Sequence, residues 1–304
     1  MYYYQDIKNE LVNKVGIQAN DIFDYQDAAL KDVFEDYFNF CQENLSERCP
    51  CYSIQPAKFY FINNTTVNAC ASHPNEYYII GVNSGTMVSL NELFKSHFLM
   101  FQGIMLFIFY HELAHLIQKS PTLVLGLSEK HNITDKSIYS IQRHVLEYDA
   151  DLNGANKLCH HLIDYWKSLE NGLKTQARFQ ELISHGVASV FIYFMFLNGD
   201  KDIYIKESCH PHNLVRILYI IDCFLHVVND EANLPNGIKI DKQLTIRETF
   251  EISDKLFKAS SNDNHIKNLT QVLDKNGDSI ENYINELSFV SNTCLHLVKN
   301  RHLL

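Results

Sequence analysis

The chain has 304 residues, enough for one large domain or two small ones, and its 46% hydrophobic and 20% charged residues are typical of a globular protein. The formal net charge is −10, and no stretch combines basic with aromatic residues, so we expect no nucleic-acid partner. The first residues lack the basic and apolar regions of a secretory signal, and the eight cysteines are scattered. Both observations favour a cytoplasmic protein with reduced thiols.

The N-terminal segment, residues 1–57, is predicted to be helical over most of residues 5–46. In the second half of that range, apolar side chains recur at the spacing of an amphipathic helix: Leu30, Val33, Phe34, Tyr37 and Phe38. A connection follows. Three short segments rich in aromatic and β-branched residues then predict a small sheet, with strands at residues 58–63, 67–71 and 77–83.

Two helices are expected after the sheet, the first over residues 84–98 and the second ending near residue 120. The second helix is apolar on all sides, which indicates burial, and it contains the motif His111-Glu112-Leu113-Ala114-His115. Residues four apart share one helical face, so His111 and His115 can hold one zinc ion, and Glu112 can serve as general base toward a water molecule there. The alternative is a core helix whose polar side chains hydrogen-bond to their neighbours.

A loop is predicted over residues 121–135, followed by a long helix over residues 137–168. This helix carries Glu147 and Asp151, which are again four residues apart. Glu147 is a candidate third metal ligand, and Asp151 is a candidate acceptor for the second nitrogen of a metal-binding histidine. The alternative is an acidic face in contact with solvent.

The remaining chain is predicted to be mainly helical. The apolar runs at residues 98–110 and 187–197 are too short to span a membrane, so we expect no integral membrane segment and at most contact with a membrane surface. Residues 217–228 are expected to form a further buried helix. The C-terminal segment, residues 231–304, is polar, with helical spacing near its end. It contains no identifiable chemistry and is expected to pack on a core formed by residues 58–230, as part of one domain.

Three motifs together resemble those of the gluzincin metallopeptidases. H-E-x-x-H is followed by Glu147-Tyr148-Asp149-Ala150-Asp151, which fits E-x-x-A-D. The segment from Ser208 to Arg216 resembles the (S/T)-x-H-P-x-x-x-x-R segment of the CAAX-prenyl-protease-like group. The whole is also similar to the Lit family of phage-exclusion cell-death peptidases.

This resemblance implies a zincin-like core in which the small sheet precedes the H-E-x-x-H helix. It implies one Zn²⁺ per chain, held by His111, His115 and Glu147. His210 and Arg216 would contact the substrate carbonyl or the oxyanion, although His212 competes with His210 for that role. The substrate would pair with an edge strand, for which residues 68–71 are the candidate: Asn68, Ala69, Cys70 and Ala71.

The sequence therefore predicts a mostly helical α+β protein that acts as a zinc-dependent endopeptidase on a protein or peptide substrate. A role in phage defence would require narrow specificity or latency, and hence an activating partner. Two alternatives stay open. One is a metal-binding interaction module without hydrolytic activity, and the other is a helical scaffold in which H-E-x-x-H occurs by chance.

Overall fold

The structure, a computed structural model, describes most of the chain: residues 2–120, 139–198, 203–229, 238–260 and 269–294. Over these residues the protein is mostly helical with one three-stranded sheet, which confirms the predicted α+β class. The loop predicted at residues 121–135 lies outside the described residues.

The N-terminal segment is helical at its two ends and irregular between them. Helix α1 (Tyr4–Glu10) continues as one π-helical turn and stops at Gly16, whose φ of 84° is a left-handed value that glycine adopts without strain. Helix α2 (Lys31–Arg48) is the predicted amphipathic helix. The prediction of helix between them is wrong, because this stretch pairs with the sheet: Phe23 donates its N–H to the carbonyl of Phe61 at 2.9 Å.

The sheet contains the three predicted strands, each within two residues of its expected start: β1 (Ala57–Ile62), β2 (Ala69–Ser72) and β3 (Tyr78–Asn83). The order is β1-β3-β2, with β1 parallel and β2 antiparallel to β3. The central strand β3 is buried along its whole length. Strand β2 lies at the edge, and its outer side has no strand partner within the described ranges.

Helices α4 (Phe98–Ile117) and α5 (Ile141–Ser168) carry the two predicted motifs and pack closely against each other. A Cβ atom on Gly154 of α5 would lie 2.8 Å from Cδ2 of Phe107 on α4, so the two backbones approach to a distance that only glycine permits. The helix before them, α3 (Ser84–Leu93), ends five residues earlier than predicted.

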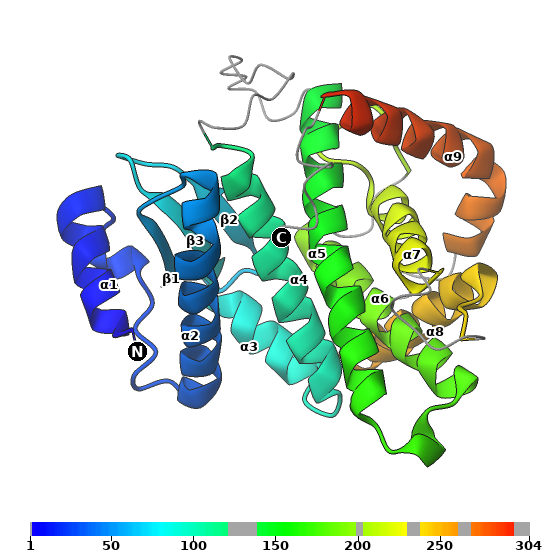
Figure 1. Cartoon of the computed structure of the whole chain (residues 1–304), viewed down its shortest axis with the longest axis horizontal. Helices are drawn as coiled ribbons and strands as arrows, with labels where there is room; N and C mark the ends of the chain where they lie inside the picture. Colours follow the sequence, from blue (N-terminus) through cyan, green and yellow to red (C-terminus); the bar gives the residue numbers. More distant parts are fainter. Residues whose placement is uncertain (1, 121–138, 199–202, 230–237, 261–268, 295–304) are drawn as a thin grey trace.

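The rest of the described chain forms four helices: α6 (Gln176–Asn198), α7 (Asn213–Asn229), α8 (Lys242–Ser260) and α9 (Leu269–Cys294). One hydrophobic core contains side chains from α1 through α9. Helix α4 lies in the middle of the molecule, with the sheet, α1 and α2 on one side and α5 and the later helices on the other (Figure 1). The metal-motif helix is therefore surrounded by protein.

Two of these helices, α4 and α6, are long and apolar enough to cross a membrane by length and composition alone. In this fold 83% of the apolar window in α4 and 78% of that in α6 are buried inside the protein. Burial of this degree is typical of core helices and weighs against a membrane span.

Candidate metal centre

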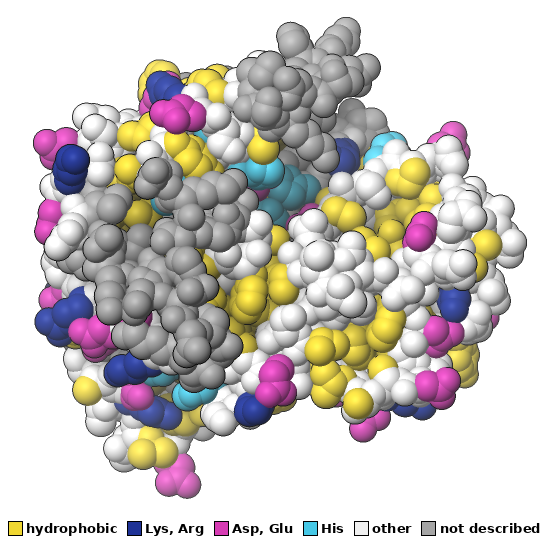
Figure 2. Space-filling model, turned by 180° about the vertical axis from the view of Figure 1, so that it is seen from behind, with side chains coloured by type: hydrophobic (Ala, Val, Ile, Leu, Met, Phe, Trp, Pro, Cys, Tyr) yellow, Lys and Arg dark blue, Asp and Glu magenta, His cyan; other side chains and the backbone are white. Residues whose placement is uncertain are grey.

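A cleft of about 760 Å³ opens where β2, α4, α5, α6 and the segment before α7 meet. On the face seen in Figure 2, histidine side chains gather in a recess. The lining combines titratable groups with apolar ones: Thr66, Val67, Asn68, Ala69, Cys70, Ala71, His111, Glu112, His115, Lys119, Glu147, Tyr193, Phe196, Leu197, His210 and Arg216. The cleft thus contains every residue for which the sequence predicted a catalytic, metal-binding or substrate-pairing role, with the exception of Asp151.

The two histidines of α4 converge on one point. Nε2 of His111 lies 3.1 Å from Nε2 of His115, as expected for side chains one helical turn apart. Glu147 reaches the same point from α5. Its Oε2 is 3.7 Å from Nε2 of His111, and its Oε1 is 3.5 Å from Nε2 of His115.

These separations match the requirements of a zinc ion. Ligands at about 2.0–2.1 Å from the metal in a tetrahedron lie roughly 3.3 Å from one another. The three ligand atoms lie within 4.8 Å of one another, and the three side chains are largely buried. His111, His115 and Glu147 could therefore hold a metal ion, and the fourth side of the site faces the cleft.

Hydrogen-bond partners orient the two imidazole rings. Nδ1 of His115 lies 2.8 Å from Oε1 of Gln118, whose amide N–H₂ donates to the Leu146 carbonyl at 3.0 Å. Nδ1 of His115 must then carry the proton, which leaves Nε2 without one. Nδ1 of His111 lies 3.0 Å from Oδ1 of Asp151, although the N–H does not point straight at that oxygen. Two unprotonated nitrogens and a carboxylate thus face one another, an arrangement that a cation would stabilise.

The protonation states of His115 and Glu147 also suit metal binding. Burial lowers the pKa of His115 to about 4, so the ring is neutral near pH 7. Burial would raise the pKa of Glu147, but the neighbouring histidines and Arg216 hold it below its usual value, so this carboxylate is ionised. His111 differs from these two groups. Burial alone would lower its pKa, but Asp151 outweighs that effect and raises the pKa of His111, so a metal ion would have to displace a proton from this ring.

Asp151 is the centre of a buried ionic network. Arg216 donates from Nε to Oδ2 at 2.8 Å and from its NH2 group to Oδ1 at 2.7 Å, and the Tyr219 hydroxyl donates to Oδ2. Arg216 is 3% exposed, and its guanidinium lies 3.8 Å from the centre of the Phe194 ring. Sequence analysis placed Arg216 at the oxyanion. In the structure its strongest contacts go to Asp151, with a weaker approach of 3.7 Å to Glu147.

Glu112 lines the cleft and is 5% exposed. Burial raises the pKa of its carboxyl group to about 7, and the negative charge of Glu147 acts in the same direction. A carboxylate with a pKa near neutrality can both accept and return a proton at physiological pH. Tyr193, which is buried beside it in the cleft lining, was not identified from sequence, since it lies within an apolar run of α6 that carries no motif.

The two competing histidines occupy different positions. His210 lines the cleft with its side chain 47% exposed, and its Nε2 lies 3.5 Å from Oε1 of Glu147. His212 is buried, and its Nδ1 accepts the backbone N–H of Leu214 at 3.1 Å, which caps the start of α7. Of the two, His210 lines the cleft and His212 does not.

The edge strand β2 forms another wall of the cleft. Cys70 is exposed, and Ala69 and Ala71 present small side chains on the other face of the strand. Asn68 lies just before the strand, and its backbone N–H and carbonyl bond to the Thr86 hydroxyl at 2.8 Å. The strand therefore has a fixed start and small side chains, and it forms the edge of the sheet within the described part of the chain.

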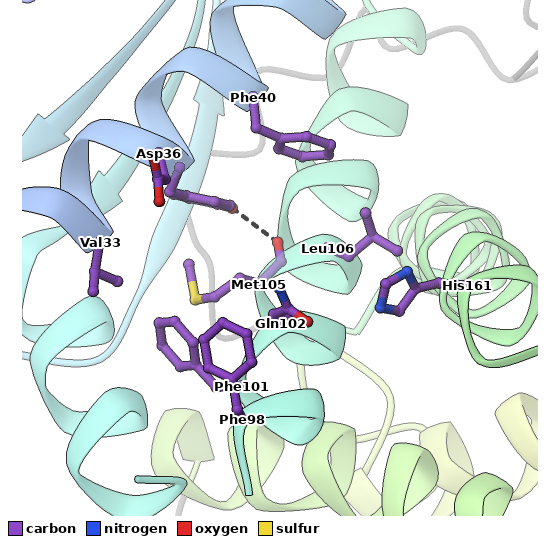
Figure 3. Close-up of a pocket in the computed structure, with 10 residues that line it drawn as sticks. Val33, Asp36, Phe40, Phe98, Phe101, Gln102, Met105, Leu106 and His161 are labelled. Carbon is purple, nitrogen blue, oxygen red and sulfur yellow. Dashed lines mark hydrogen bonds between the residues drawn. The ribbon is translucent and has the colours of Figure 1, made fainter. Parts of the chain in front are cut away.

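A second hollow, of about 330 Å³, lies against the other end of α4 and is mainly apolar. Figure 3 shows its lining from α2, α4 and α5: Val33, Asp36, Tyr37, Phe40, Phe98, Phe101, Gln102, Met105, Leu106 and His161. Its one drawn hydrogen bond joins the Tyr37 hydroxyl to the Met105 carbonyl at 2.9 Å. We refer to it as the apolar groove.

Comparison with known proteins gives no relative. No family model matches the chain, and no curated protein and no solved structure matches it at a significant level. The function proposed below therefore depends on the residues of the cleft and their geometry.

Proposed function

We propose that this protein is a zinc-dependent endopeptidase of the gluzincin type. The observation that supports it most is the convergence of His111, His115 and Glu147 at separations suited to zinc, with Glu112 beside them. The convergence lies in a cleft that is also lined by β2, an edge strand of the sheet over the described residues. In a scaffold with a chance H-E-x-x-H motif, nothing would require Glu147 to lie beside the two histidines in a cleft.

Two nitrogens and one carboxylate oxygen are a typical zinc-peptidase ligand set. A zinc ion held there would lower the pKa of a water molecule towards neutrality and polarise the scissile carbonyl. Asp151 keeps the His111 ring oriented, and Gln118 does the same for the His115 ring, so the ligand atoms are preorganised.

Glu112 is the general base of the proposed reaction. It takes a proton from the attacking water and transfers it to the leaving amine. The negative charge that develops on the carbonyl oxygen is met by the imidazole of His210, which is exposed in the cleft. Arg216 acts mainly on Asp151, which keeps the carboxylate ionised and fixed.

The proposed substrate is an extended protein or peptide segment that adds to the outer edge of β2. Main-chain hydrogen bonds along residues 69–71 would supply affinity with little demand on sequence. The small side chains of Ala69 and Ala71 allow a second backbone to approach. The resemblance to the Lit family suggests cleavage of a protein in the cytoplasm during phage defence, with activity restricted by narrow specificity or by an activating partner.

Metal analysis of purified protein tests the central part of this proposal. About one zinc per chain is expected in wild type, with loss of the metal in His111→Ala and in Glu147→Ala. His226→Ala is the matched control, since this exposed histidine lies on α7 outside the cleft. A chain without stoichiometric metal, purified without chelator, would refute the peptidase. Bound zinc without cleavage of any peptide in a quenched-fluorescence library would instead indicate an interaction module.

A further inference from the structure

The segment that carries His210, residues 203–212, has neither helix nor strand. His210 itself is held weakly. Within the described part of the chain, its Nδ1 contacts the adjacent Cys209 sulfur at 3.0 Å, and its Nε2 approaches Glu147 at 3.5 Å. The position of the imidazole in the cleft is therefore set by whatever holds the backbone of this segment.

His144 of α5 is one of the groups that hold the backbone of residues 203–212. This side chain is fully buried, and its Nε2 lies 2.7 Å from the carbonyl oxygen of Ser208, two residues before His210. A carbonyl only accepts, so Nε2 must carry the proton. Nδ1 is then an acceptor, and the Tyr283 hydroxyl of α9 is its hydrogen-bond partner. Tyr283 thereby fixes the tautomer that bonds to Ser208.

Helix α9 holds the same segment at a second point. Nζ of Lys206 forms an ion pair with Oε2 of Glu286 at 2.6 Å and lies 5.6 Å from the centre of the Tyr283 ring. The helix itself is anchored, because Ile280 and Leu287 are buried in the core on either side of Tyr283. Helix α9 is therefore linked to the segment on both sides of residue 207, directly at Lys206 and through His144 at Ser208.

We propose that α9 positions His210 for catalysis through Tyr283, His144 and the Ser208 carbonyl, with Lys206–Glu286 as a second fastening. His144 and Tyr283 are then positioning residues. They touch neither the ligand cluster nor the open part of the cleft, since neither is among the cleft-lining residues. The proposal gives the polar C-terminal segment a role in the active site. This inference rests on the proposed peptidase function.

The test uses the full-length protein with Tyr283→Phe, which removes only the hydroxyl group. Glu281→Gln, an exposed position on the same helix, is the matched control. Hydrogen exchange is expected to accelerate at least tenfold in residues 203–212 and to stay unchanged in α4, with zinc content still about one per chain. On a quenched fluorescent peptide that wild type cleaves, kcat should fall roughly 10- to 100-fold with little change in KM, because a donor displaced by about 1 Å loses transition-state contact.

The His210→Ala background separates positioning from general stability. If Tyr283 acts through His210, then adding Tyr283→Phe to His210→Ala causes no further loss of kcat. An equal loss in both backgrounds, or wild-type exchange in residues 203–212 of Tyr283→Phe, overturns the proposal. Hydrogen exchange can be measured without turnover. A protein that cleaves no peptide would refute the peptidase, and hydrogen exchange in Tyr283→Phe would still show whether α9 holds residues 203–212 in place.

Discussion

The metal-motif cleft and the apolar groove lie against two ends of the same helix, α4. They differ in how many buried polar groups they contain and in the partners of those groups. In the cleft, buried His111, His115, Glu147 and Asp151 each approach an oppositely charged or hydrogen-bonding group. The groove is smaller and is lined mainly by aromatic and aliphatic side chains, and Gln102, one of its few polar members, is exposed (Figure 3).

This difference distinguishes a candidate functional site from a simple gap between packed helices. Burying ionisable groups costs several kcal/mol each unless partners compensate. The cleft brings several such groups together with partners for most of them, which indicates a constraint beyond folding. The groove is lined mainly by apolar side chains. Its polar members Asp36 and Gln102 are exposed, and His161 is partly buried there. Substitutions in the cleft should therefore have large effects, and matched substitutions in the groove should have small ones.

The largest effect is expected from Glu112→Gln. The amide cannot accept the water proton, so kcat should fall by about 10²- to 10⁴-fold while zinc remains bound at about one per chain. Peptide cleavage and elemental analysis on the same preparation measure both quantities. Gln102→Ala, on the same helix at the groove, should leave both unchanged. Retention of most activity in Glu112→Gln would show that the proposed mechanism is wrong.

Asp151→Asn should have the next largest effect. It leaves Arg216, which is 3% exposed, without its ionic partner, and removing one member of a buried pair costs about 3–5 kcal/mol of unfolding free energy. Zinc affinity should also fall by about 10- to 100-fold, because the His111 ring loses its orienting group. Asp36→Asn in the groove should change stability by less than about 0.5 kcal/mol. Urea unfolding and competition with a zinc chelator provide the two measurements, and similar values for both variants would contradict the comparison.

Local patterns predicted the parts of the cleft that lie within single elements. His111 and His115, or Glu147 and Asp151, need only helical geometry to share a face, and the strands are marked by their composition. The pairing of Asp151 with Arg216 joins residues 65 positions apart and depends on how α5 packs against α7. No local pattern encodes that packing. The sequence therefore predicts a role for Arg216 in the cleft, but it does not predict the contact of Arg216 with Asp151.

A similar limit applies to His144, for which the sequence shows only a position three residues before Glu147 on the same helix. The structure gives it a buried position between Ser208 and Tyr283, two residues from different parts of the chain. Gln118 was also missed, although its place three residues after His115 on the same helical face was a usable signal.

Two histidines of α5 allow a comparison by pH, since His144 is buried between Ser208 and Tyr283 and His161 lines the groove. Burial lowers the pKa of His144 to about 4 from an ordinary value of 6.5, so between these values the unfolded chain binds a proton that the folded chain does not. This contribution is complete above pH 6.5 and is lost as the pH falls towards 4. From pH 7.5 to 4.5, metal-free wild type should lose about 2–3 kcal/mol more than His144→Gln.

His161→Gln should change that pH dependence less. Burial also lowers the pKa of His161, but this ring is only partly buried, at the edge of the groove. Urea unfolding at the two pH values, with chelator present throughout, gives both differences. An equal effect of the two substitutions would show that the two histidines experience the same degree of burial, contrary to the structure.

The smallest expected effect tests the contact between α4 and α5 that brings the ligands together. In Gly154→Ala, the new Cβ would lie 2.8 Å from Cδ2 of Phe107 and 2.9 Å from its carbonyl oxygen, so the helices must separate slightly. Overpacking of this kind costs about 1–3 kcal/mol, and because Glu147 moves with α5, zinc affinity should fall as well. Gly277→Ala on α9, where no atom lies within 4 Å of the added Cβ, should instead stabilise the protein by about 0.5–1 kcal/mol and leave zinc affinity unchanged. Thermal unfolding with and without chelator separates the two effects. If Gly154→Ala destabilises the protein without weakening zinc binding, then the ligand geometry does not depend on the close approach of these helices.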